Sequence, residues 1–139
     1  MITDSVSVVV RSADIQIVAL SAVKRTTVVA QLREQLGVDV LHPSPWGSRS
    51  APEGCPRADG WELIPQYVGA ASCLMFLPGA TAIWQFGSGA DLLLVLKESS
   101  AMEFYVCDDE ARYLLCCNDH DFLIGWGIAA PWVASLAQA

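Results

Sequence analysis

The most chemically capable stretch of the chain is a run of six residues with two thiols, an imidazole, two carboxylates and an amide. It reads Cys116-Cys117-Asn118-Asp119-His120-Asp121. A structural zinc site takes four ligands, typically from separated cysteine or histidine pairs. The remaining soft ligands are spread singly along the chain, at His42, Cys55, Cys73 and Cys107. We therefore expect no metal and no other cofactor, and keep a zinc site on Cys116, Cys117 and His120 as the alternative.

The same stretch also has the residue types of a thiol nucleophile. Such a site needs a thiolate close to an imidazole, and a third group that orients the imidazole. Neighbours along a strand-to-helix turn point in different directions, which disfavours a pair between His120 and either thiol. The chain has no Gly-x-Ser-x-Gly elbow, no glycine-rich phosphate loop and no His-Glu-x-x-His motif. A small thiol- or metal-dependent enzyme is therefore the second hypothesis. We expect Asn118 or Asp119 to cap a helix instead.

Acidic residues dominate the charge of the chain, with fifteen acidic and eight basic residues and a formal net charge of −7. Phosphate binding depends on clustered lysine and arginine, so we expect no nucleic-acid partner. An acidic surface favours a basic protein partner, because complementary fields speed the encounter. The run Asp108-Asp109-Glu110 lies in a predicted turn, and we expect the strand pair over residues 103–117 to bring it near Asp119 and Asp121.

A second candidate contact surface lies at residues 38–60. This stretch is rich in proline, glycine and serine, which predicts an irregular loop. Long loops inside compact domains are often functional, and tryptophan and arginine are enriched in interface hot spots. The alternative is a surface loop anchored in the core by its tryptophan. The partner-binding residues that we expect are Trp46, Arg49, Asp108, Asp109, Glu110, Asp119 and Asp121.

Capping and turn signals predict the elements that position these residues. Ser21 and Gly37 bracket a helix over residues 22–36. The Pro78-Gly79 turn lies between two apolar runs and predicts a hairpin. We expect strands at residues 15–20, 72–77, 81–86, 103–107 and 113–117, a strand or short helix at 5–10, and helical segments at 61–67, 91–97 and about 120–136.

These elements predict a single α+β domain over residues 1–139. We expect an antiparallel meander of about four or five strands, with an N-terminal and a C-terminal helix packed on it. Pro131 is expected to kink the last helix rather than end it. Trp126 and Trp132, six residues apart, would then leave different sides of that helix. A homodimer that buries Trp132 and the last helix is the third hypothesis.

The cysteine count and the hydropathy pattern bear on location. The five cysteines are an odd number, and the N-terminus lacks the pattern of a secretory signal, which predicts reduced thiols in the cytoplasm. Residues 63–90 and 122–139 carry no charge. Glycine and proline interrupt both stretches and lysine and arginine do not flank the second, so we expect buried core elements and no membrane span.

Residues 103–133 resemble the C-terminal part of small acidic bacterial proteins. The resemblance is carried by a strand–turn–strand segment, by Asn118-Asp119-His120-Asp121-Phe122 after it, and by Trp132-Val133. Several such families are uncharacterised, and others are immunity proteins of toxin systems. The resemblance implies a binding role in a bacterial cytosol and assigns no residue a role. We therefore expect a non-enzymatic protein-binding module, an immunity-type inhibitor that neutralises a toxin or effector.

Overall fold

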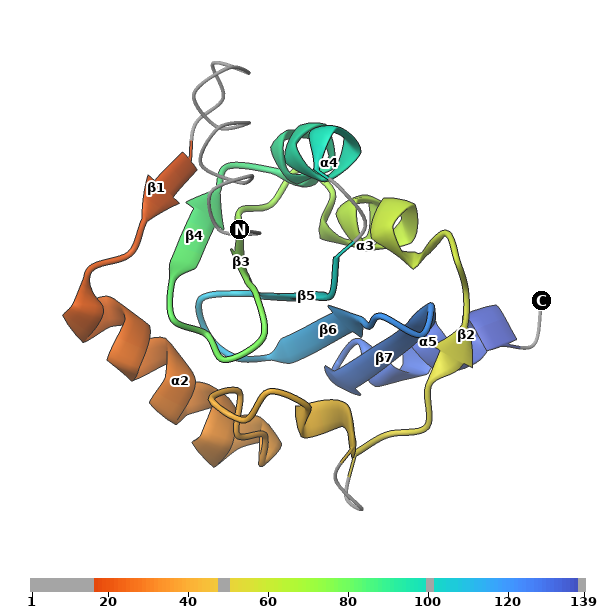
Figure 1. Ribbon diagram of the computed structural model, residues 1–139, viewed down its shortest axis with the longest axis horizontal. Helices are drawn as coiled ribbons and strands as arrows, with labels where there is room; N and C mark the ends of the chain where they lie inside the picture. The colour runs from red at the N-terminus through yellow and green to blue at the C-terminus, as the bar shows by residue number, and fades with distance from the viewer. Residues whose placement is uncertain (1–16, 48–50, 100–101, 138–139) are drawn as a thin grey trace.

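The computed structural model describes residues 17–47, 51–99 and 102–137, and within these ranges the protein has an α+β fold (Figure 1). Four α-helices and one seven-stranded antiparallel sheet make up the described part. The helices are α2 (Ala22–Leu36), α3 (Gly60–Val68), α4 (Gly89–Glu98) and α5 (Ala130–Ala137), with a 3-10 turn η1 at Pro45–Gly47. The strands are β1 (Ile17–Ala19), β2 (Cys55–Pro56), β3 (Cys73–Phe76), β4 (Ile83–Phe86), β5 (Phe104–Cys107), β6 (Tyr113–Cys117) and β7 (Phe122–Gly127).

The α+β class is confirmed, although the sheet has more strands than the four or five expected. The extra strands are β2 and β7. The helix expected over residues 22–36 is α2: Ser21 Oγ accepts from the Lys24 amide at 3.2 Å, and Gly37 ends the helix at φ +68°. The strand or helix expected at residues 5–10 lies outside the described residues.

The strands follow the order β1-β4-β3-β5-β6-β7-β2, and every neighbouring pair is antiparallel. The hairpin predicted around Pro78-Gly79 is β3–β4. Helix α4 follows β4, and the chain then returns beside β3 as β5. Strands β5, β6 and β7 form the meander, so β6 has a turn to a neighbouring strand at each end.

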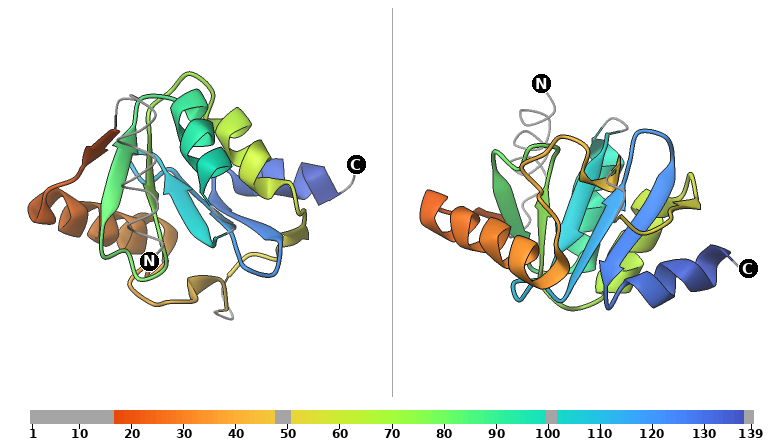
Figure 2. Two further views of the ribbon diagram at one scale, coloured as in Figure 1. Left: turned by 45° about the horizontal axis from the view of Figure 1, so that its top comes forward. Right: turned by 90° about the horizontal axis from the view of Figure 1, so that it is seen from below.

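Helices cover both faces of the sheet (Figures 1 and 2). Helix α2 and the segment after it pack on one face, while α3, α4 and α5 pack on the other. On β5, Phe104 and Val106 join the α3–α4–α5 side, and Tyr105 and Cys107 join the α2 side. Strands buried on both faces are continuously apolar rather than alternating, which explains the apolar runs in the sequence.

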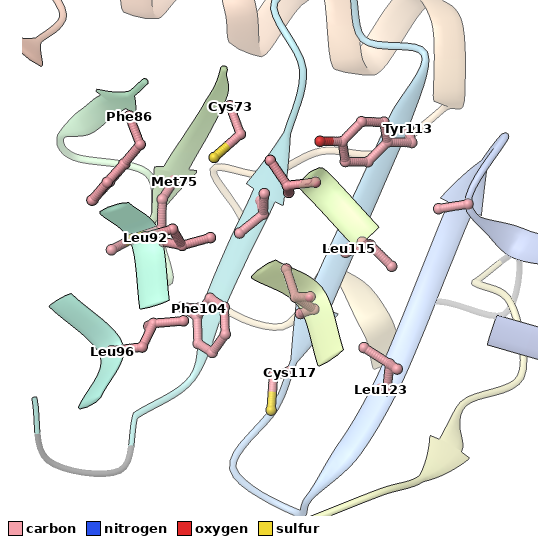
Figure 3. Close-up of a cluster of buried hydrophobic side chains, with 14 of the residues drawn as sticks. Cys73, Met75, Phe86, Leu92, Leu96, Phe104, Tyr113, Leu115, Cys117 and Leu123 are labelled. Atoms are coloured by element: carbon pink, nitrogen blue, oxygen red, sulfur yellow. The ribbon is translucent and has the colours of Figure 1, made fainter. Parts of the chain in front are cut away.

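The core on the α3–α4–α5 side is close-packed (Figure 3). Leu92 and Leu96 of α4 lie over Met75 of β3 and Phe104 of β5, and all four side chains are buried. Burying a large apolar side chain contributes about 1.5–3 kcal/mol relative to leaving it exposed. This layer therefore supplies a major share of the stability and fixes α4 against the sheet.

The expected C-terminal helix over residues 120–136 is wrong in its first half, which is strand β7. Asn118 does not cap a helix, because its Oδ1 accepts from the amides of His120 and Phe122 at 2.9 and 3.0 Å and closes a tight turn. The Asn118 amide also donates to the Phe122 carbonyl at 3.0 Å, which starts the β6–β7 ladder. The apolar run after this turn fits a buried strand as well as a helix, and strand pairing decides between them.

The corrected end of the chain also changes the expectations for Pro131 and the tryptophans. Pro131 lies in the first turn of α5, where its missing N–H is not needed, so it starts the helix rather than kinking it. Trp126 is on β7 and packs on the α2 side, whereas Trp132 is on α5 and packs against Tyr67 with ring centroids 4.7 Å apart. The two side chains therefore lie on opposite sides of the sheet.

None of the helices in the described ranges has both the length and the apolar character needed to cross a membrane. The two uncharged stretches are divided among shorter elements. Residues 63–90 contain most of α3 and the β3–β4 hairpin, and residues 122–137 contain β7 and α5.

The contact between α3 and α4 yields a first prediction, because it depends on a glycine. A Cβ at Gly89 would lie 2.1 Å from the Pro65 carbonyl oxygen, and the Gly89 amide donates to the Gly69 carbonyl at 2.8 Å. We expect Gly89→Ala to lower the free energy of unfolding by about 1–3 kcal/mol, the usual effect of overpacking. The matched control is Gly47→Ala, where a Cβ would meet no atom within 4 Å. Equal urea midpoints for the two variants would contradict this packing.

Candidate functional site

The two adjacent thiols of the sequence do not form a site with His120. Cys116 and Cys117 are consecutive on β6, so their side chains lie on opposite faces of the sheet, and both are buried. His120 lies in the β6–β7 turn with its side chain 67% exposed. Within the described residues, no group of three or more histidine, cysteine, aspartate or glutamate side chains is arranged to hold a metal ion.

The environment of both thiols disfavours the thiolate that catalysis or metal binding needs. Burial raises the pKa of Cys117 to about 11, and the negative charges of Asp121 and Glu103 add to the effect. Burial raises the pKa of Cys116 further still, again with a contribution from Glu103. At neutral pH both cysteines are therefore protonated, and they serve as small apolar residues of the core.

The two acidic groups lie at opposite ends of β6, which corrects the expectation that they share one region. Residues 108–110 lie in the β5–β6 turn before β6, and Asp119 and Asp121 lie in the β6–β7 turn after it. The expectation failed because an antiparallel meander places successive turns at alternate ends of the sheet.

In the β5–β6 turn, Asp108 has a structural role. Its side chain is only 7% exposed, forms an ion pair with the Arg112 guanidinium, and accepts from the Arg112 amide at 2.8 Å. These bonds hold a turn in which Ala111 has a left-handed φ of +55°. Asp109 and Glu110 are exposed, so only these two residues of the run have the solvated position that we expected.

At the other end of β6, Glu103 joins three parts of the chain. Its Oε2 accepts from the Trp46 indole at 3.2 Å and from the Tyr105 hydroxyl at 2.9 Å. Its Oε1 lies 3.4 Å from the Asp119 amide, which donates to it. The Trp46 ring also meets His120 edge to face, with centroids 5.7 Å apart. The loop that holds Trp46 is thereby fixed beside the β6–β7 turn, whereas Arg49 lies outside the described residues.

Two hollows lie on this end of the sheet. The first, of about 390 Å³, is bounded by α3, the end of α4, the start of β5 and the β6–β7 turn. The second, of about 460 Å³, is bounded by the Trp46 loop and the same turn. Met102 and Asp119 line both hollows, so the two are neighbours on one surface. We call this surface the acidic end and define it by Trp46, Trp61, Met102, Glu103, Asp119 and Asp121.

A third hollow, of about 560 Å³, lies on the α2 side and is lined by Asp39, His42 and Trp126 among others. Two of its polar side chains, those of Asp39 and His42, already bond within the chain. Asp39 pairs with Arg33 at 3.3 Å and accepts from the Leu41 amide at 3.1 Å, and His42 Nδ1 accepts from the Ser44 amide at 2.9 Å. The acidic end is therefore the better candidate for a charged partner.

Sequence reasoning named three of the six residues of the acidic end, Trp46, Asp119 and Asp121. It missed Trp61, Met102 and Glu103 as site residues. A carboxylate directly before a fully apolar strand is a usable signal for Glu103, because such a charge must lie at the end of the sheet. No comparable signal exists for Trp61, which reaches the surface only through the placement of α3.

The raised thiol pKa values predict a loss of stability in alkali. Burial raises the pKa of Cys73 to about 12 and that of Cys117 to about 11, whereas an unfolded chain releases these protons near pH 9. Above pH 9 the unfolded state therefore holds fewer protons than the folded state, so the free energy of unfolding falls as the pH rises. This contribution to the stability is complete below pH 9 and is lost as the pH rises toward 11. Each thiol should lower the free energy of unfolding by about 1.4 kcal/mol per pH unit in this window. Urea unfolding at pH 8, 9 and 10 measures the slope, and Cys117→Ala should make it shallower; an unchanged slope would contradict the assignment.

The Glu103 junction predicts a second stability effect. Glu103→Ala leaves the buried Tyr105 hydroxyl and the Trp46 indole without their acceptor, so we expect a loss of about 2–3 kcal/mol in the free energy of unfolding. Glu110→Ala is the matched control, because Glu110 is 68% exposed, and we expect a change within about 0.5 kcal/mol. Urea denaturation followed by tryptophan fluorescence measures the free energy of unfolding of both variants. If Glu103→Ala lost no more stability than Glu110→Ala, the hydrogen bonds of Glu103 would contribute nothing to the stability of the fold.

Comparison with known proteins assigns the chain to no family. No protein-family model, no curated protein and no solved structure matches it. The resemblance of residues 103–133 to immunity-type proteins therefore stays an expectation. Function has to be argued from the chemistry of the acidic end.

Proposed function

We propose that the protein is a non-enzymatic binding module that inhibits a basic protein partner, in the manner of an immunity protein that neutralises a toxin or effector in a bacterial cytoplasm. The observation that carries this proposal is the acidic end. Two adjacent hollows there combine apolar walls with three carboxylates, from Glu103, Asp119 and Asp121. A concave apolar surface with an acidic rim suits a protruding basic segment of another protein.

The physics of protein interfaces supports this surface as the contact. Binding energy concentrates in a few aromatic or arginine anchors within desolvated pockets, and the rim contributes mainly orientation and on-rate. Trp46 is half-buried and held by Glu103 and His120, so it presents a rigid edge at low entropic cost. The net charge of −7 attracts a basic partner over a distance of about a Debye length, roughly 8–10 Å.

The negative charge of the acidic end favours one type of partner, a toxin that acts on nucleic acid. Proteins that bind nucleic acid gather lysine and arginine to neutralise phosphates. An inhibitor with clustered carboxylates offers such a surface an alternative set of negative charges. The buried, protonated thiols of Cys116 and Cys117 give no comparable support to the enzyme hypothesis.

A matched pair of double variants tests the proposal. Asp119→Asn with Asp121→Asn removes two negative charges from the acidic end. Asp109→Asn with Glu110→Gln removes the same number from the far end of β6. We expect a partner captured from the native cytosol by wild-type protein at low salt to be retained by the second variant and lost by the first. Growth arrest caused by expressing that partner should be relieved by wild-type protein and by the second variant only.

Two results would overturn the proposal. Equal capture by both double variants would exclude the acidic end as the contact. Loss of capture only with the Asp109 and Glu110 changes would move the contact to the β5–β6 turn, the other acidic group expected from the sequence. Circular dichroism of both variants controls for folding, and Asn is tolerated at the left-handed position of Asp121.

A further inference from the structure

We propose that the hollow between α3, α4 and the β6–β7 turn receives the side chain of an arginine from the partner protein. This inference rests on the proposed function and names one side chain of the partner and the hollow that binds it. It concerns the first hollow, of about 390 Å³, whose size lies at the lower end of the roughly 300–1,000 Å³ typical of ligand pockets.

The walls of this hollow suit the aliphatic stem of a long cationic side chain. Trp61, Leu96, Met102 and Phe104 supply them from α3, α4 and β5. Leu96 and Phe104 are buried in the core and Trp61 and Met102 are half-buried, so the walls are held by packing. Arginine covers apolar surface with its stem and keeps its charged head at a polar edge.

Three aspartates of the described residues are neutralised within the chain, unlike the carboxylates at the edge of the hollow. Asp39, Asp59 and Asp108 each pair with an arginine of the chain, at Arg33, Arg57 and Arg112. Over the described ranges, by contrast, neither Asp119 nor Asp121 has a lysine or arginine within ion-pair distance. Asp119 Oδ1 lies 3.6 Å from His120 Nε2, and Asp121 forms no ion pair there. These two exposed carboxylates are thus available to bind a cation from outside this part of the chain.

Arginine fits this arrangement better than lysine. Its planar guanidinium has five donors, enough to bond both carboxylates, and it stacks on aromatic faces such as the Trp61 wall. Lys97 also lines the hollow, from the last turn of α4, and contributes an opposing positive charge. The positive charge of Lys97 therefore opposes the binding of an arginine to the two carboxylates. Removing that charge should strengthen binding, whereas removing the carboxylates should weaken it.

The backbone of Asp121 provides a second variant. Its φ is +61°, in the left-handed region that glycine adopts more readily than aspartate. Asp121→Gly should therefore leave the stability unchanged or raise it, while it removes a carboxylate from the hollow. A change that preserves the fold and weakens binding separates a contact role from a structural one.

The test uses two tripeptides on the full-length protein, acetyl-Gly-Arg-Gly-amide and the same peptide with citrulline, the neutral isostere of arginine. Binding is followed by nuclear magnetic resonance, through the Trp61 indole N–H and the backbone amides of Asp119 and Asp121. We expect saturable shifts at these positions with the arginine peptide and none with the citrulline peptide. Asp119→Asn with Asp121→Asn should weaken the affinity about tenfold, and Lys97→Gln should strengthen it about two- to fivefold, as expected for partly exposed charge pairs.

Three outcomes would overturn the assignment. Equal binding of the citrulline peptide would show that charge is not recognised. Shifts that map to Asp109 and Glu110 would place the cation site elsewhere. Spermidine that binds this hollow more tightly than the arginine peptide would assign it to a small polyamine rather than to a protein side chain.

The inference and the proposed function fail in distinguishable ways. If the captured partner depends on Asp119 and Asp121 but the arginine peptide does not bind, the acidic end remains the interface and only the arginine assignment falls. If the arginine peptide binds as expected but partner capture is the same for both double variants, the hollow is a cation site and the inhibitor proposal falls.

Discussion

The burial of the sheet on both faces is the constraint on which the rest of the structure depends. Helix α2 covers one face and α3, α4 and α5 cover the other, so the side chains of β3, β5 and β6 all lie in the interior. A charged group inside such a sheet would be strongly destabilising unless it were paired. The charges near the central strands are therefore confined to the turns and strand ends, and any polar recognition by these strands must take place there.

The side chain of Tyr105 links the buried sheet to the candidate site. Its ring is stacked on Phe76 at 5.3 Å within the core, but its hydroxyl needs a hydrogen-bond partner. Glu103, two residues earlier and on the same side of β5, accepts that bond at 2.9 Å. The same carboxylate then accepts from Trp46 and from the amide of Asp119. A requirement of the core thus positions both the tryptophan and the acidic turn at the acidic end.

The sequence was sufficient where capping or turn residues marked the boundaries of an element. Ser21 and Gly37 bracket α2 with standard capping chemistry, and Pro78-Gly79 marks the β3–β4 hairpin, so both elements could be predicted. The segment after Asn118 could not, because an uncharged apolar run fits a buried strand as well as a helix. The expected meeting of the two acidic groups was a separate error, because the predicted hairpin of β5 and β6 by itself places residues 108–110 and 119–121 at opposite ends of β6.

The two turns of β6 use their carboxylates differently. In the β5–β6 turn, Asp108 both fixes the backbone and neutralises Arg112, so its charge is committed to the fold. In the β6–β7 turn, the buried Asn118 amide side chain accepts from two backbone N–H groups, and backbone bonds and the Glu103 carboxylate also hold the loop. The carboxylates of Asp119 and Asp121 are then not needed to hold the turn, although they gather like charge beside Glu103. The charge of these two carboxylates is therefore not committed to the fold, and this is the property that the proposed recognition of a basic partner requires.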